Sequence, residues 1–79
     1  MTLYEFYIVF PDGEVQEITH RLGISDIVDI NGNVLTPPLP TNRMLAYHVS
    51  GMRTSEERGL VITKYMLEQF NSQELFEYI

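Results

Sequence analysis

The clearest alternation of side chains lies in residues 3–13, LYEFYIVFPDG. With a period of two, large apolar side chains fall on one face and mixed side chains on the other, as in a strand with one well-covered face. Pro11-Asp12-Gly13 then favours a type I turn followed by a left-handed glycine. The segment therefore predicts a strand, a tight turn and a returning strand.

Residues 14–22 fit two patterns. As a strand they continue the hairpin, whereas as a helix they place Val15, Ile18, Thr19 and Leu22 on one stripe that ends at Gly23. The turn before them and the β-branched residues favour a strand in the first half. The helix stays open as the alternative.

A second turn is predicted after the alternating DIVDI of residues 26–30. The pair Asn31-Gly32 is typical of a two-residue type I′ hairpin turn, and Val34 and Leu35 would return from it. Residues 36–40, TPPLP, hold three prolines that exclude regular strand or helix. They predict a stiff connector across one end of the sheet.

The second half of the chain predicts another long hairpin. Residues 43–53 alternate as a strand with a bulge or bend at Gly51, residues 54–59 form a polar stretch, and residues 60–69 are the partner strand. A single helix over residues 55–70 is the alternative, since Thr54 and Glu57 have the form of a capping box. A short helix is predicted after Asn71 or Ser72.

These elements predict a mainly β fold. We expect a small antiparallel sheet of about five strands, curled into an open SH3-like barrel or half-barrel and closed at one end by the short C-terminal helix. The likeness to SH3 barrels is one of architecture and rests on no family motif. Residues 1–79 are expected to form a single small globular domain.

Composition narrows the classes of function. Five basic and eleven acidic side chains give a net charge of −6, which opposes binding to nucleic acid and to anionic membranes. The chain has no cysteine, and neither a signal-like start nor an apolar stretch long enough to span a bilayer is evident. We therefore expect a cytoplasmic protein.

Candidate chemistry is sparse. His20 and His48 are the only histidines, and they have no paired ligand spacing. The oxygen ligands of residues 29–33 resemble the start of a calcium loop but lack its later glycine and terminal glutamate. Residues 17–25 resemble a helix-turn-helix turn, yet acidic side chains occupy the segment that would enter DNA. No catalytic residue, metal site or cofactor is predicted.

An interaction module is the function that this pattern favours. Several apolar residues on the second strand faces have no evident partner inside so small a protein, and we expect them to form an interface with a protein partner or a homodimer: Leu3, Tyr7, Val9, Met44 and Met52. The alternative is a small nucleic-acid-binding barrel that gathers its five cations on one surface, with Tyr7 or Tyr47 for stacking. An enzyme or metal site built on the two histidines ranks third.

Overall fold

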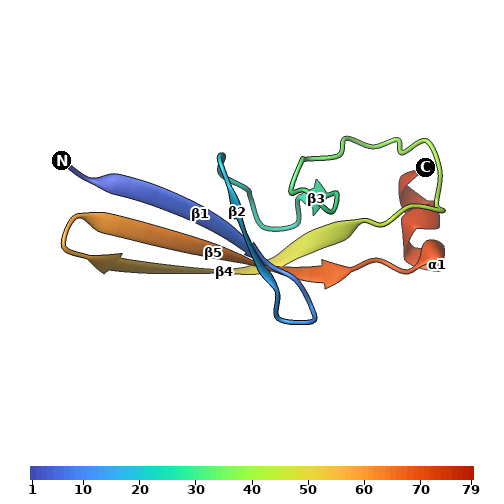
Figure 1. Cartoon of the computed structure of the whole chain (residues 1–79). Helices are drawn as coiled ribbons and strands as arrows, with labels where there is room; N and C mark the ends of the chain where they lie inside the picture. The colour runs from blue at the N-terminus through green and yellow to red at the C-terminus, as the bar shows by residue number, and fades with distance from the viewer.

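The protein folds as an open β half-barrel. The computed structural model describes residues 1–79 and contains five strands, followed by the helical turns α1 (Ser72–Leu75) and η1 (Phe76–Tyr78). The strands are β1 (Leu3–Val9), β2 (Val15–Ile18), β3 (Ile27–Val28), β4 (Tyr47–Glu57) and β5 (Leu60–Gln69). They form one sheet in the order β2-β1-β5-β4-β3 (Figure 1). The mainly β half-barrel with a short C-terminal helix is thus confirmed.

The sheet is mixed rather than antiparallel throughout as predicted, because one of its pairings is parallel. Strand β1 pairs with β2 antiparallel but with β5 in parallel register, from Leu3 opposite Leu60 to Val9 opposite Met66. The other two pairings, β4 with β5 and β3 with β4, are antiparallel. The first strand therefore lies between its own hairpin partner and a strand from the far end of the chain.

The first turn forms as predicted. Phe10 N–H donates to the Glu14 carbonyl, Gly13 N–H donates to the Phe10 carbonyl, and Gly13 has a φ of 92°. This is a three-residue loop with glycine in the left-handed position. Strand β2 follows it directly, so the strand interpretation of this segment is confirmed and the helix over residues 14–22 is excluded.

The turn at Asn31 differs from its prediction. Gly32 N–H donates to the Asp29 carbonyl, Asp29 N–H donates to the Asn33 carbonyl, and only Gly32 takes a positive φ. The loop therefore has three residues rather than the two of a type I′ turn. The Asp29 carboxylate stabilises this longer loop by accepting the N–H groups of Asn31 and Asn33 at 2.8 and 3.0 Å.

The second long hairpin is confirmed, and the helix over residues 55–70 is excluded. Its first strand nevertheless begins at Tyr47 instead of Arg43 and continues to Glu57, into the polar stretch that we expected to separate the two strands. The turn is Arg58-Gly59, where both φ angles are positive, 51° and 82°, as a type I′ turn requires. The predicted bulge is present as a register shift between Val49 and Gly51.

Two apolar clusters form the core. The larger lies on the front face of the sheet, the face that carries Ile8, Tyr65 and Val49; its buried members are Ile8, Ile18, Leu22, Val28, Tyr47, Val49, Tyr65 and Leu67. The smaller lies where α1 and the proline connector meet the end of the sheet, and contains Ile27, Leu39, Ala46 and Leu75. Ile27 and Val28 join different clusters because successive side chains of a strand point to opposite faces.

The proline connector crosses the end of the sheet, as predicted. Leu39 is buried in the smaller cluster, and its N–H donates to the Tyr78 carbonyl at 2.6 Å. Ala46 is also fully buried there and Met44 packs against the same cluster, so this segment lies on the cluster instead of joining the sheet. This packing explains why β4 begins four residues later than the alternation predicted.

Candidate functional site

The long strands extend beyond both clusters as a three-stranded blade, which we define as residues 3–6, 54–57 and 60–63 with the turn between the last two. The molecule measures 44 × 23 × 17 Å, and the blade forms the end of its long axis nearest the N-terminus (Figure 1). Within the blade only Thr63 is buried. Most of its side chains are therefore available for contact.

The rear face of the sheet carries a band of apolar side chains. The registers place Leu3 beside Leu60, Glu5 beside Ile62 and Val9 beside Met66, all on the side opposite to Ile8. Neither α1 nor η1 contacts a strand there, and none of these side chains is buried. An apolar strip of this kind on an uncovered sheet face is typical of an interface, although Glu5 and Lys64 interrupt it.

A charged row crosses the same rear face. Glu17, Tyr7, Lys64 and Arg53 lie directly opposite one another on β2, β1, β5 and β4. The Tyr7 hydroxyl donates to Glu5 Oε1 at 2.7 Å, and this hydrogen bond is the main cause that raises the Tyr7 pKa above 10.0. Lys64 and Arg53 are like charges in adjacent positions.

The front face of the blade is partly covered by one cation. The Arg21 guanidinium lies 5.5 Å from the ring centroids of both Tyr4 and Phe6, within the range of a cation–π contact. These residues line a small hollow of about 180 Å³ together with Met52 and Val61. Met52 is 52% exposed on this face.

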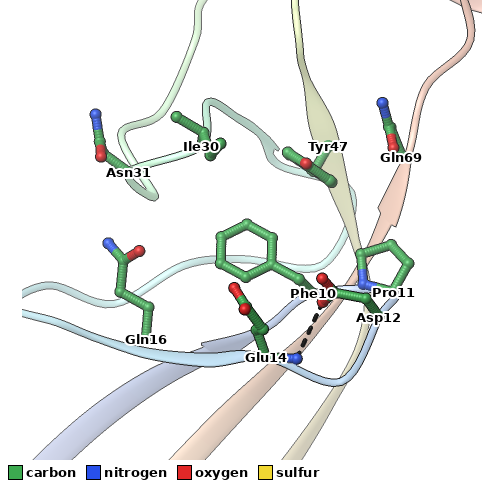
Figure 2. Close-up of a pocket in the computed structure, with 9 residues that line it drawn as sticks. All are labelled: Phe10, Pro11, Asp12, Glu14, Gln16, Ile30, Asn31, Tyr47 and Gln69. Carbon is green, nitrogen blue, oxygen red and sulfur yellow. Dashed lines mark hydrogen bonds between the residues drawn. The ribbon is translucent and has the colours of Figure 1, made fainter.

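A second hollow, of about 480 Å³, lies between the turns at Pro11 and Asn31 (Figure 2). Phe10 packs edge-on against Tyr47, with ring centroids 5.2 Å apart, and the remaining lining is mainly carboxylate and amide: Pro11, Asp12, Glu14, Gln16, Ile30, Asn31 and Gln69. It contains no cationic side chain and no histidine. Its carboxylates disfavour anionic ligands.

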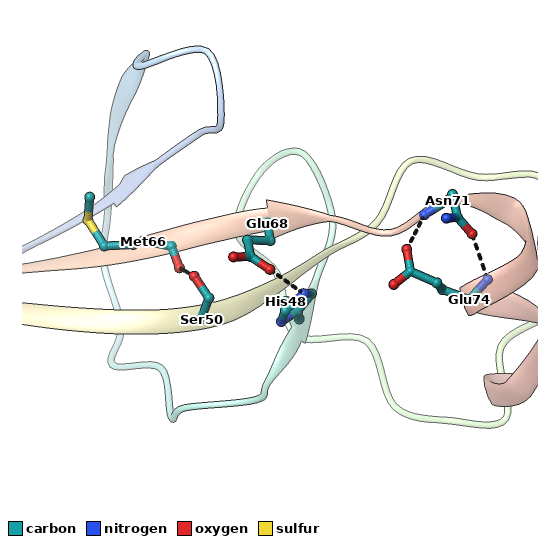
Figure 3. Close-up of polar contacts among 6 residues, drawn as sticks. All are labelled: His48, Ser50, Met66, Glu68, Asn71 and Glu74. Carbon is teal, nitrogen blue, oxygen red and sulfur yellow. Dashed lines mark hydrogen bonds and ion pairs between the residues drawn. The ribbon is translucent and has the colours of Figure 1, made fainter.

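The two histidines lie in different places and make different contacts. His20 Nε2 is 2.9 Å from the Gly32 carbonyl oxygen, and His48 Nε2 is 3.3 Å from Glu68 Oε2 (Figure 3). His48 also packs against the Phe70 ring at 4.8 Å. No group of three or more histidine and carboxylate side chains is arranged to hold a metal ion.

The predicted interface residues fall on three surfaces. Leu3, Tyr7 and Val9 lie together on the rear face, whereas Met52 is on the front face and Met44 packs against the smaller cluster. Sequence reasoning missed other members of the rear strip, which are Val15, Leu60, Ile62 and Met66. The alternation of residues 60–66 was the signal that could have identified the last three.

Comparison with known proteins gives a family but no function. A family model described as "Uncharacterised Treponema protein" matches residues 2–78. Neither the curated proteins nor the solved structures include a match to this chain. No helix of the protein is long and apolar enough to cross a membrane.

Proposed function

Since the chain belongs to this family of uncharacterised Treponema proteins, whose description assigns no activity, we propose from its surface that it is a non-catalytic interaction or assembly module. It binds a protein partner through the blade and the rear face of the sheet. A second copy of the chain is the simplest such partner. The absence of cysteine supports a reducing, cytoplasmic location.

The apolar strip on the rear face carries this proposal. Leu3 is 59% exposed and Val15 is 53% exposed, although they flank half-buried neighbours on adjacent strands. Exposed apolar residues that stand alone are ordinary, but a strip shared by three strands removes much apolar area from water when a partner covers it. The charged row of Glu17, Lys64 and Arg53 crosses the strip and offers polar contacts to the same partner.

The chemistry of the side chains supports a non-catalytic role. His20 and His48 contact different partners, and the hollow beside Phe10 places no histidine or cation beside its carboxylates. An enzyme needs its acid, base or nucleophile grouped around one substrate position. Binding is the activity that such a surface performs best.

One observation favours a second candidate, nucleic-acid binding. Tyr7, Lys64 and Arg53 lie in one row and combine a ring with two cations. Glu5 and Glu17 lie beside the same ring, however, and Arg43 is in a distant loop. Under this candidate the purified protein binds single strands with an affinity that falls steeply with salt, and the protein-interaction proposal expects no such binding.

Photo-crosslinking in the native cell tests the interaction proposal. A photoreactive phenylalanine analogue replaces Ile62 on the rear face, and as the control it replaces Ile30, which is 48% exposed in the loop after β3. We expect a discrete protein adduct from position 62 and none of the same mass from position 30. Equal adducts at both positions, or none at position 62, would contradict the proposal.

A further inference from the structure

The outer edge of β4 has no neighbouring strand over seven residues, Gly51 to Glu57. Strand β3 pairs only with Tyr47 and His48 of β4. The loop before β3 forms backbone hydrogen bonds with β4 only at Val49, through Ser25 and Asp26. The other open edges are shorter: four residues in β2 and three in β1 beyond the reach of β2. An open edge is a template for another strand, and this is the longest one.

The direction of the backbone groups along this edge follows from the turn. Glu57 and Leu60 close the two-residue turn and bond to each other, so alternation directs the backbone groups of Met52, Thr54 and Glu56 outward. No strand of the same chain meets these groups. They are available to an antiparallel partner strand.

The charges beside the edge lack partners within the chain. Arg53 lies directly opposite Lys64, and like charges in this position destabilise a sheet. Glu57 is on the same face, opposite Leu60, and the only ion pair within the chain joins His48 to Glu68. An unpaired cation and an unpaired anion thus lie four residues apart on one edge, an arrangement that is complementary to itself under a two-fold rotation.

We propose that β4 pairs antiparallel with β4 of a second copy about a two-fold axis at Ser55, an inference that rests on the interaction role proposed above. This register places Arg53 of each copy opposite Glu57 of the other. Thr54 and Glu56 of opposite copies exchange their N–H and C=O bonds, and the two Ser55 side chains meet at a close, non-hydrogen-bonded position that small residues suit. The two sheets become one continuous sheet, with both rear strips on the same side.

The charges select this register over its neighbours. With the axis at Thr54, Arg53 would face Ser55 and lose its carboxylate, and with the axis at Arg53 the two arginines would oppose each other. Only the axis at Ser55 gives two opposite-charge pairs by symmetry. The anion that Glu57 supplies also offsets the repulsion between Arg53 and Lys64.

Sedimentation of the full chain and of charge variants tests the proposal. The wild type is expected to form a dimer, at twice the 9.2 kDa chain mass, at micromolar concentration. Arg53→Glu and Glu57→Arg should each weaken the dimer by about tenfold or more, because each creates two like-charge pairs, and the double variant should restore it. Arg43→Glu makes the same charge change in a loop outside the sheet and should leave the dimer intact.

Two results would overturn the proposal. A wild-type monomer under these conditions excludes the β4 dimer, and a dimer that neither Arg53→Glu nor Glu57→Arg weakens excludes this register. Neither result decides the broader role, because crosslinking at position 62 to a different protein would still support an interaction module. If position 62 gives no adduct and the dimer depends on Arg53 and Glu57, the β4 pairing stands and binding through the rear face is contradicted.

Discussion

Ile8 in β1 lies directly opposite Tyr65 in β5, and the two strands run in the same direction. Ile8 is fully buried and Tyr65 is 3% exposed, so this pair forms the centre of the larger cluster. The two residues are far apart in sequence, and each strand also pairs with its own hairpin partner. The contact therefore joins the N-terminal and C-terminal hairpins into one sheet.

Truncating Ile8 should lower the free energy of unfolding more than any surface substitution does. Ile8→Ala removes fully buried methyl groups and should lower the free energy of unfolding by about 2–5 kcal/mol. Ile24→Ala is the matched control, since Ile24 is 57% exposed, and it should change stability by less than about 0.5 kcal/mol. Urea unfolding measures both, and equal effects would show that the parallel pairing is not the centre of the core.

Gly32 and Gly13 should respond differently to alanine. Both have a positive φ, 82° and 92°, so alanine is strained at either position by roughly 1–2 kcal/mol. A Cβ at Gly32 would also lie 2.8 Å from Ile18 Cγ2, whereas nothing lies within 4 Å of one at Gly13. Gly32→Ala should therefore lower the melting temperature clearly more than Gly13→Ala, and the reverse order would contradict the packing of this loop on the core.

The local features that the sequence predicted were those encoded by neighbouring residues. The Pro11-Asp12-Gly13 turn, the bulge near Gly51 and the cap at Asn71 each depend on a few adjacent side chains. The turn at Asn31 was predicted with the wrong length because the Asp29 carboxylate stabilises a longer loop. The type I′ turn formed instead at Arg58-Gly59, where arginine gave no such signal.

The surface that we propose for binding was only partly predictable. Alternation in residues 3–9 identified Leu3, Tyr7 and Val9 as one face, but not the strand that would lie beside them. Parallel pairing with β5 is a long-range choice that no local pattern encodes, and it brings Leu60 and Ile62 to the same strip. The sequence pattern assigns no strand to the polar residues at the end of β4, because neither face of that part of the strand packs on a core.

Replacing Arg58 should stabilise the protein. Arg58 has a φ of 51° in a type I′ turn, a conformation that asparagine adopts at lower cost. Arg58→Asn should raise the free energy of unfolding by up to about 1 kcal/mol. Arg43→Asn removes the same charge where φ is not positive and should give no gain, so equal gains in thermal unfolding would attribute the effect to charge.

The C-terminal helix should depend on one cap. Asn71 Oδ1 accepts the Glu74 N–H at 2.8 Å, and Glu74 Oε1 accepts the Asn71 N–H at 2.9 Å (Figure 3). Asn71→Ala should cost about 1 kcal/mol, because α1 holds Leu75 in the smaller cluster. Ser72→Ala, one residue later, should cost less than about 0.5 kcal/mol in the same unfolding assay. A larger loss of stability from Ser72→Ala than from Asn71→Ala would show that Ser72, and not Asn71, caps the helix.

The pair Glu5–Tyr7 should make stability fall at high pH. The hydrogen bond to Glu5, followed by desolvation and the charges of Glu5 and Glu17, raises the pKa of Tyr7 above 10.0 in the folded state. The folded protein therefore keeps a proton that the unfolded chain releases, so the contribution is complete below pH 10.0 and is lost as the pH rises through the folded pKa. The absorbance of tyrosinate, compared between the wild type and Tyr7→Phe, isolates this group among the five tyrosines.

Glu5→Ala should return the pKa of Tyr7 toward 10.0, whereas Glu14→Ala, in the first turn, should not. An unchanged titration of Tyr7 in Glu5→Ala would show that the hydrogen bond to Glu5 is not the main cause of the raised pKa in this rear-face row.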